Sequence, residues 1–346
     1  MKFQKQHLCQ LPCCYAVSPL MQDGRLKYVL ATDDIGPCYC IDAQSMECET
    51  VWQEPGGTMS IVPLPGTNGD FLATQLFLPN FSALHAKIMR VMRINGQWQQ
   101  QLWMQLPYVH RFDILQRGGQ NYFLGCILST TDQEQADWSK PGILVAAPID
   151  ADFTPPAQLE TIAVGMSRNH GYFRVERDDY SMCYTACDQG VFQIAPPPHP
   201  DLPWEIKTLL DIPASDVAVC DLDNDGEEEL AVIQPFHGNE FVIYKKYDGH
   251  YQEIYRYPTP VDFLHAIWGG TLCGENVFLA GCRALDKELF LIRWTSNGPK
   301  EEVIERGFGP SNVAVFGDGE TDYVLTANRQ KDEGALFTVR KEEPIL

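Results

Sequence analysis

One loop motif recurs through the chain, and its period constrains the fold more than any other feature. The fullest copy spans residues 221–233 (DLDNDGEEELAVI), where an acidic turn leads directly into an apolar run. Shorter copies, in which a glycine or aspartate turn precedes an apolar run, recur at intervals of roughly 45 to 60 residues: Asp23-Gly24, Asn68-Gly69-Asp70, Gly118-Gly119, Asp178-Asp179, Gly274-Glu275 and Asp318-Gly319. A period of this size with several short strands per unit is typical of a β-propeller.

The apolar runs are short, rich in β-branched and aromatic residues and bounded by turn residues, as β-strands are, and helical periodicity is nearly absent. We therefore predict an all-β fold, a seven-bladed β-propeller with four antiparallel strands per blade, as a single domain over residues 1–346. The expected blades are 9–52, 57–104, 107–163, 166–210, 212–257, 262–305 and 309–341. The leading segment from Phe3 to Leu11 is expected to supply the outer strand of the last blade, which closes the ring and hides its edge strands.

Composition excludes some classes of function. The 46 acidic and 26 basic side chains give a formal net charge of −20, which disfavours binding to nucleic acid or to anionic membranes. No run approaches the roughly 18 apolar residues of a membrane helix, and the N-terminal segment has no apolar stretch typical of an export signal. We therefore expect a cytoplasmic protein without membrane or nucleic-acid partners, in which the 12 cysteines are reduced and packed as small apolar side chains.

The full acidic loop carries oxygen ligands at its first, third, fifth and ninth positions: Asp221, Asp223, Asp225 and Glu229. This spacing, with Gly226 in the turn, suits a hard cation and predicts a structural calcium ion. It is not an EF-hand, because Val232 stands where the bidentate acid would be. The alternative is an acidic turn whose carboxylates cap their own backbone.

Histidines recur just before the expected innermost strands of three blades, at His110, His170 and His265, and His237 follows a second strand that ends at the same rim. Since the starts of innermost strands open at one mouth of the ring, these four side chains are expected to converge. Neutral imidazoles in such a group suit a divalent transition metal such as zinc or manganese. We assign His170, His237 and His265 as metal ligands and His110 as a general base or fourth ligand.

Several of these segments resemble the propeller domain of fungal aldos-2-ulose dehydratase and, more broadly, FG-GAP/VCBS-type propellers that include sugar lyases. The likeness covers about half of the chain and is carried by residues 110–113, 137–142, 169–171, 221–230, 235–238, 265–269 and 281–283. The fungal enzyme has additional cupin-like domains without a counterpart here, so its dimer and isomerase step do not carry over. The resemblance implies a lyase that eliminates water or an alkoxide next to the carbonyl of a keto-sugar, with a metal and histidines at the channel mouth.

The residues are consistent with that chemistry. Abstraction of a proton next to a ketone needs a base of near-neutral pKa and a positive group that stabilises the enolate. His110 and His170 are the candidate catalytic histidines, and Arg111 or Arg283 could stabilise the enolate or bind a hydroxyl or carboxylate substituent. The expected function is β-elimination on a keto-sugar or 3-keto-glycoside, with a small neutral carbohydrate as substrate.

Two other functions stay open. A non-catalytic propeller that binds proteins or glycans would hold no transition metal, since fold does not determine function. A lyase or glycosidase acting on uronate polymers would require export and a basic cleft, which the missing signal and the excess of acidic residues disfavour.

Overall fold

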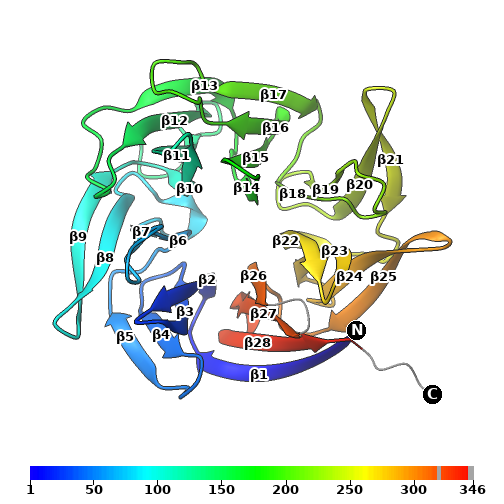
Figure 1. The fold of residues 1–346 in the computed structure, drawn as a ribbon, viewed down its shortest axis with the longest axis horizontal. Coiled ribbons are helices and arrows are strands. Elements are labelled where there is room, and N and C mark those ends of the chain that lie inside the picture. Colours follow the sequence, from blue (N-terminus) through cyan, green and yellow to red (C-terminus); the bar gives the residue numbers. More distant parts are fainter. Residues whose placement is uncertain (318–320, 342–346) are drawn as a thin grey trace.

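Seven four-stranded antiparallel sheets are arranged around a central axis, which confirms the predicted seven-bladed β-propeller (Figure 1). The computed structural model describes residues 1–317 and 321–341. In each sheet the strands follow one another in sequence order from the centre outward, except where the ring closes. Hairpin connections of this kind need only local turns, which is why the period of the sequence predicts the number of blades.

The first four blades contain the following strands, from the innermost outward: β2 (Cys14–Gln22), β3 (Arg25–Thr32), β4 (Cys38–Asp42) and β5 (Cys48–Trp52); β6 (Ile61–Pro63), β7 (Phe71–Gln75), β8 (Lys87–Ile94) and β9 (Gln97–Gln105); β10 (Val109–Arg117), β11 (Gln120–Ser129), β12 (Pro141–Ile149) and β13 (Glu160–Met166); β14 (Gly171–Glu176), β15 (Ser181–Cys187), β16 (Gly190–Ala195) and β17 (Glu205–Leu210).

The last three blades contain these strands: β18 (Asp216–Cys220), β19 (Glu229–Gln234), β20 (Glu240–Tyr247) and β21 (His250–Arg256); β22 (Asp262–Leu272), β23 (Glu275–Ala284), β24 (Leu289–Thr295) and β25 (Gly298–Glu305); β26 (Asn312–Gly317), β27 (Thr321–Asn328), β28 (Glu333–Arg340) and β1 (Lys2–Gln10). Two single 3-10 turns, η1 (Pro79–Phe81) and η2 (Arg329–Lys331), lie in connecting loops. No helix in the described part of the chain is long and apolar enough to cross a membrane.

The N-terminal strand closes the ring, as predicted. Strand β1 pairs antiparallel with β28, from Lys2 opposite Arg340 to Gln10 opposite Glu333, and so becomes the outermost strand of the seventh blade (Figure 1). The last blade therefore combines both ends of the chain. This pairing covers the edge of β28, which would otherwise present unpaired backbone groups to solvent.

Within the described residues, the recurring glycine and aspartate turns join the innermost strand of a blade to the next strand outward. Six of the seven turns are seen in this place, and the one at Asp318-Gly319 lies outside the described residues. At the first turn both Asp23 and Gly24 have positive φ, 52° and 69°, as in a type I′ hairpin turn. The repeat in the sequence is thus a repeat of the connection between the first two strands of a blade, at one face of the ring.

Apolar side chains fill the spaces between neighbouring blades. Every residue of the second strands β7 and β15 is buried, because both faces of these short strands pack against adjacent sheets. Ten of the 12 cysteines are buried, and all 12 are free thiols. The rigid ring that results positions the loops at its two faces.

Candidate functional site

One residue from each blade lies at or near the start of the innermost strand, and together these residues form a ring around one mouth of the channel. They are Tyr15, Ser60, His110, His170, Ser215, His265 and Ser311. Hydrogen bonds join several neighbours around the ring. The Ser60 hydroxyl donates to the carbonyl of His110 at 3.0 Å, and the Ser311 hydroxyl lies 3.4 Å from the carbonyl of Tyr15. The blades are therefore linked through the positions that carry the histidines.

Three members of this ring are inserted residues at β-bulges, which have no paired residue on the neighbouring strand. The pairing register shifts between Cys14 and Ala16, between Val109 and Arg111, and between Leu264 and Ala266. Tyr15, His110 and His265 are thus β-bulge residues without a Cα partner on the second strand. Bulges redirect side chains and are frequent near active sites. Here three bulges from three blades direct their side chains to the same place.

The three bulge side chains contact one another directly. The Tyr15 hydroxyl lies 3.3 Å from Nε2 of His110 and 3.2 Å from Nε2 of His265. All three residues are buried. Burial raises the pKa of Tyr15 to about 12, so the phenol keeps its proton at neutral pH.

The structure brings the four predicted histidines together. Nε2 of His170 lies 3.3 Å from Nε2 of His237, and the ring centroids of His110 and His265 lie 4.3 and 5.1 Å from that of His170. One ligand atom from each of His170, His237 and His265 falls within 4.8 Å of the other two. His170, His237 and His265 come from three different blades.

Backbone carbonyls set the orientation of two of these rings. Nδ1 of His170 lies 3.3 Å from the carbonyl oxygen of Ser215, and Nδ1 of His265 lies 2.6 Å from that of Ser311. Because a carbonyl can only accept, each Nδ1 carries the hydrogen and each Nε2 is left as an acceptor. The Tyr15 hydroxyl faces the Nε2 of His265 at 3.2 Å, and Nε2 of His237 faces that of His170 at 3.3 Å. Metal-ligating histidines are commonly held by this kind of outer hydrogen bond.

The fourth imidazole is held in a different way. His237 lies in the loop between β19 and β20 with a positive φ of 47°, and its backbone N–H donates to the Ser215 hydroxyl at 3.1 Å. Ser215 therefore contacts both His170, through its carbonyl, and His237, through its hydroxyl. The separation of 3.3 Å between these two Nε2 atoms matches the spacing of about 3.3 Å between two ligands of a tetrahedral zinc ion with bonds of about 2.0–2.1 Å.

All four imidazoles are neutral at physiological pH. Burial lowers the pKa of His110, His170 and His265 well below the usual range, and nearby positive charge acts in the same direction. Burial, together with Arg283 and Arg168, lowers the pKa of His237 to about 3. Neutral imidazoles can bind a metal or accept a proton, so the group fits the donor set of a transition-metal site.

The histidines line a cavity of about 240 Å³. Its other polar lining residues include Tyr15, Asp33, Arg283 and Arg329. Asp33 accepts a hydrogen bond of 2.6 Å from Nε of Arg329. Arg283 is 7% exposed and stacks over Phe263, with its Cζ 4.3 Å from the ring centroid. Of the two predicted arginines, the structure places Arg283 in the histidine cavity.

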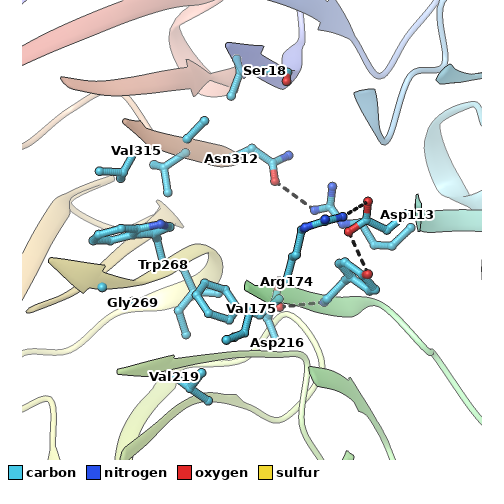
Figure 2. Close-up of a pocket in the computed structure, with 18 of the residues that line it drawn as sticks. Ser18, Asp113, Arg174, Val175, Asp216, Val219, Trp268, Gly269, Asn312 and Val315 are labelled. Atoms are coloured by element: carbon cyan, nitrogen blue, oxygen red, sulfur yellow. Dashed lines mark hydrogen bonds and ion pairs between the residues drawn. The ribbon is translucent and has the colours of Figure 1, made fainter. Parts of the chain in front are cut away.

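Arg111 lines a neighbouring and larger cavity of about 770 Å³ in the channel. Its guanidinium donates to the carbonyl of Met59 at 2.7 Å and to Oδ1 of Asn312 at 2.9 Å. Figure 2 shows this cavity, in which Arg174 faces Asp113 at 3.0 Å. Arg111 follows His110 in the sequence but does not line the cavity that the four histidines share.

The loop that follows β7 lines the histidine cavity with Phe77 and Phe81. The loop at residues 130–140, between β11 and β12, packs against it through the backbone bonds Ala83 N–H to Glu134 O and Ala136 N–H to Phe81 O. The rings of Phe81 and Trp138 meet edge to face at 5.2 Å. The contact between the two loops therefore includes aromatic rings and joins the second and third blades.

The predicted calcium ligands each have a partner in the chain. Nζ of Lys245 lies 2.7 Å from Asp223, 2.8 Å from Asp225 and 2.7 Å from Glu229. Burial alone would lower the pKa of Lys245, but these three hydrogen bonds raise it above its ordinary value. The ammonium group thus lies among three of the four predicted calcium ligands.

The remaining carboxylate, Asp221, accepts the backbone N–H groups of Asp225 and Gly226, both at 3.0 Å. Together with the hydrogen bond of 2.7 Å from Leu222 N–H to Glu229, this matches the alternative of an acidic turn that caps its own backbone. A bound calcium ion stays a prediction, and it would have to compete with Lys245.

Sequence reasoning missed Tyr15, Asp33 and Ser215. The repeat itself contained the signal for Tyr15 and Ser215, since both occupy the strand-start position of His110, His170 and His265 in their own blades. They were missed because tyrosine and serine are common in strands and turns and do not stand out by residue type. Nothing in the sequence around Asp33 distinguishes it from other loop aspartates.

Neither the scan against family models nor the search of curated proteins gave a match. Among solved structures the fold is similar to the PQQ-bound aldose sugar dehydrogenase of Streptomyces coelicolor, with a TM-score of 0.52 and 12% identity over 97% of this chain and 98% of that one. Similarity extends to Sqt1 of Saccharomyces cerevisiae (TM-score 0.54, 10% identity, 99% of both chains) and a putative 6-phosphogluconolactonase of Bacteroides uniformis (0.54, 12%, 85% of both chains). At these identities the comparisons show the propeller fold alone, and the FG-GAP or lyase resemblance gains no further support from them.

Proposed function

We propose that the protein is a metal-dependent carbon–oxygen lyase that acts on a small keto-sugar in the histidine cavity. One observation supports this most. His170 and His265 direct acceptor Nε2 atoms toward one buried cavity, because backbone carbonyls hold both Nδ1 atoms. Nε2 of His237 approaches that of His170 to 3.3 Å, and the Tyr15 hydroxyl lies 3.2 Å from that of His265. Such an arrangement of neutral imidazoles is costly to bury without a ligand, and it suits a transition metal.

The size and lining of the cavity support a small polyhydroxylated substrate. A volume of about 240 Å³ lies below the ~300–1,000 Å³ of pockets that hold drug-sized ligands. The cavity combines several polar groups with aromatic rings, as in sites that bind both the hydroxyl groups and the apolar face of a sugar. Two of the similar structures bear names of sugar-acting proteins, an aldose sugar dehydrogenase and a putative 6-phosphogluconolactonase.

Each residue then has a role in the elimination. His170, His237 and His265 would hold the metal, zinc or manganese, which when bound polarises the substrate carbonyl and makes the neighbouring C–H bond more acidic. The neutral imidazole of His110 takes the proton from that carbon. The electron pair of the broken C–H bond forms the C=C bond as the β C–O bond breaks. The departing oxygen takes up the proton and leaves as water or an alcohol.

Elemental analysis tests the metal and a substrate assay tests the reaction. The purified protein is expected to hold one zinc or manganese per chain, and His237→Ala and His265→Ala are expected to lose most of it. His85→Ala is the matched control, since the His85 side chain is 73% exposed and lies outside the cluster. Incubation with 3-keto-glucosides should produce an enone with ultraviolet absorption.

The same experiments distinguish the non-catalytic scaffold from the enzyme. A scaffold would contain no stoichiometric transition metal and would release no enone. Full metal content and turnover in both His237→Ala and His265→Ala would show that the site is assigned to the wrong residues.

A further inference from the structure

Arg283 is a buried cation that is not directly paired with any acid in the described residues. Within residues 1–317 and 321–341, no hydrogen bond or ion pair involves its side chain, and its Nε is fully buried without a partner. Its contact with Phe263 is a face-on stack at 4.3 Å. A ring face attracts the positive charge but leaves the in-plane N–H donors of the guanidinium unpaired.

Asp33 lines the same cavity but makes no hydrogen bond or ion pair with Arg283. Its Oδ2 is bound by Arg329 at 2.6 Å and its Oδ1 is buried without a partner, so Asp33 acts on Arg283 only across a distance. Two guanidinium groups therefore face one carboxylate, while the four histidines of the cavity are neutral. The proximity of Arg329, added to burial, lowers the pKa of Arg283. In a chain with a formal charge of −20, this small cavity is locally positive.

We propose that Arg283 binds an anionic group of the ligand, so that the substrate is a sugar acid or a sugar phosphate rather than a neutral sugar. The carbohydrate part of this inference rests on the proposed function. The planar fork of a guanidinium presents two parallel N–H donors that match two oxygens of a carboxylate or a phosphate. Burial of an unpaired guanidinium is energetically costly, and binding of such an anionic group offsets that cost.

Isothermal titration of the whole protein with three sugars tests the proposal: D-glucose as the neutral probe, D-glucuronate as the carboxylate and D-glucose 6-phosphate as the phosphate. The titrations are made with metal chelated, so that anion binding to a metal does not contribute. At least one anionic sugar should bind about tenfold or more tightly than glucose. Whichever of the two binds more tightly identifies the chemistry of the anion.

Variants test whether Arg283 causes the preference for anionic sugars. Arg283→Gln should bind all three sugars within about twofold of one another, and Arg283→Lys should retain a reduced preference because it keeps the charge and loses the fork. Arg293→Gln is the matched control from the next strand of the same blade, and its side chain lies outside the cavity. Ligand-free Arg283→Gln should melt no lower than the wild type, since it loses an unpaired buried charge.

Equal or undetectable binding of all three sugars by the wild type would overturn the proposal, as would an anion preference that survives in Arg283→Gln. These results are independent of the proposed reaction. A preference for anions in a protein without metal or turnover would reject the lyase and keep the anion site. Metal and turnover without a preference for anionic sugars would support the lyase and reject the anion site.

Discussion

The hydroxyl of Tyr15 lies 3.2 Å from Nε2 of His265, although 250 residues separate them in the chain. Both residues are β-bulges at the same position of their blades, and His110 is a third. A tyrosine that stays protonated between two neutral imidazoles can donate to only one of them at a time. It therefore links the base of the proposed reaction to a proposed metal ligand.

Tyr15→Phe tests this link. The ring should still fill its buried position, but the two imidazoles lose a shared partner, which we expect to cost about 1–2 kcal/mol in the free energy of unfolding. Turnover of a keto-sugar should fall about tenfold or more, while metal content stays unchanged if the hydroxyl acts on the proton and not on the metal. Urea denaturation and initial rates measure the two effects. Wild-type values for both would show that the hydroxyl has no role.

Ser215 is expected to act as a positioning residue for the metal ligands. Its hydroxyl accepts from the backbone of His237 at 3.1 Å and holds that residue at a φ of 47°. Ser215→Ala should weaken metal affinity about tenfold, as loss of an outer-shell contact typically does. Competition with a chromophoric chelator measures the affinity. Ser60→Ala is the matched control from the second blade, because the Ser60 hydroxyl contacts only the backbone of His110. Equal affinities for the two variants would argue against the role.

Lys245→Met should destabilise the fifth blade. The substitution leaves Asp223, Asp225 and the buried Glu229 without their shared ammonium group, and removal of one partner from a buried ionic group costs about 3 kcal/mol or more. Thermal melting with and without millimolar calcium measures the loss and any rescue.

In this comparison calcium should stabilise Lys245→Met more than the wild type, because the ion would replace the ammonium. Lys246→Met, one residue along β20, is the control and should melt like the wild type. A wild-type melting temperature that rises strongly with calcium would instead support the calcium site predicted from the sequence.

The buried carboxyl group of Asp216 is expected to make the free energy of unfolding depend on pH. Burial raises its pKa from 3.8 to about 7, although Arg111 and backbone N–H groups act in the opposite direction. A carboxyl group whose pKa is higher in the folded than in the unfolded protein makes its full contribution to stability at pH values below its pKa in the unfolded chain. That contribution is lost as the pH rises through the folded value. The wild type should therefore lose up to about 4 kcal/mol from this group between pH 4 and pH 7.

Asp216→Asn should remove this dependence. The amide oxygen can still accept from Tyr172 N–H and Val217 N–H, as Asp216 does at 3.2 and 3.0 Å. We expect the variant to be more stable than the wild type at pH 8 and no more stable at pH 4, as measured by urea denaturation at both values. An identical pH profile for the two proteins would contradict the assignment.

The sequence alone determined the number of blades, the place of the turns and the closure of the ring by the N-terminal strand. These features depend on contacts that are local or repeat at a fixed period, such as the turn at Asp23-Gly24, whose residues both tolerate positive φ. His110, His170 and His265 could also be placed at one rim, because equivalent positions of a closed ring lie at the same height. His237 could be placed there because it follows a second strand that ends at the same rim.

Only the tertiary structure decided which side chains share a cavity and which are already paired. Lys245 reaches the acidic loop because the register of β19 and β20 places it there, and no spacing rule for calcium ligands includes that strand. A bulge in β2 directs Tyr15 into the histidine group. Arg283 lines the histidine cavity, whereas Arg111, which follows the bulge residue His110, lines the neighbouring cavity. Such side-chain placements follow from packing between blades that are far apart in the chain, and a repeat pattern does not contain that information.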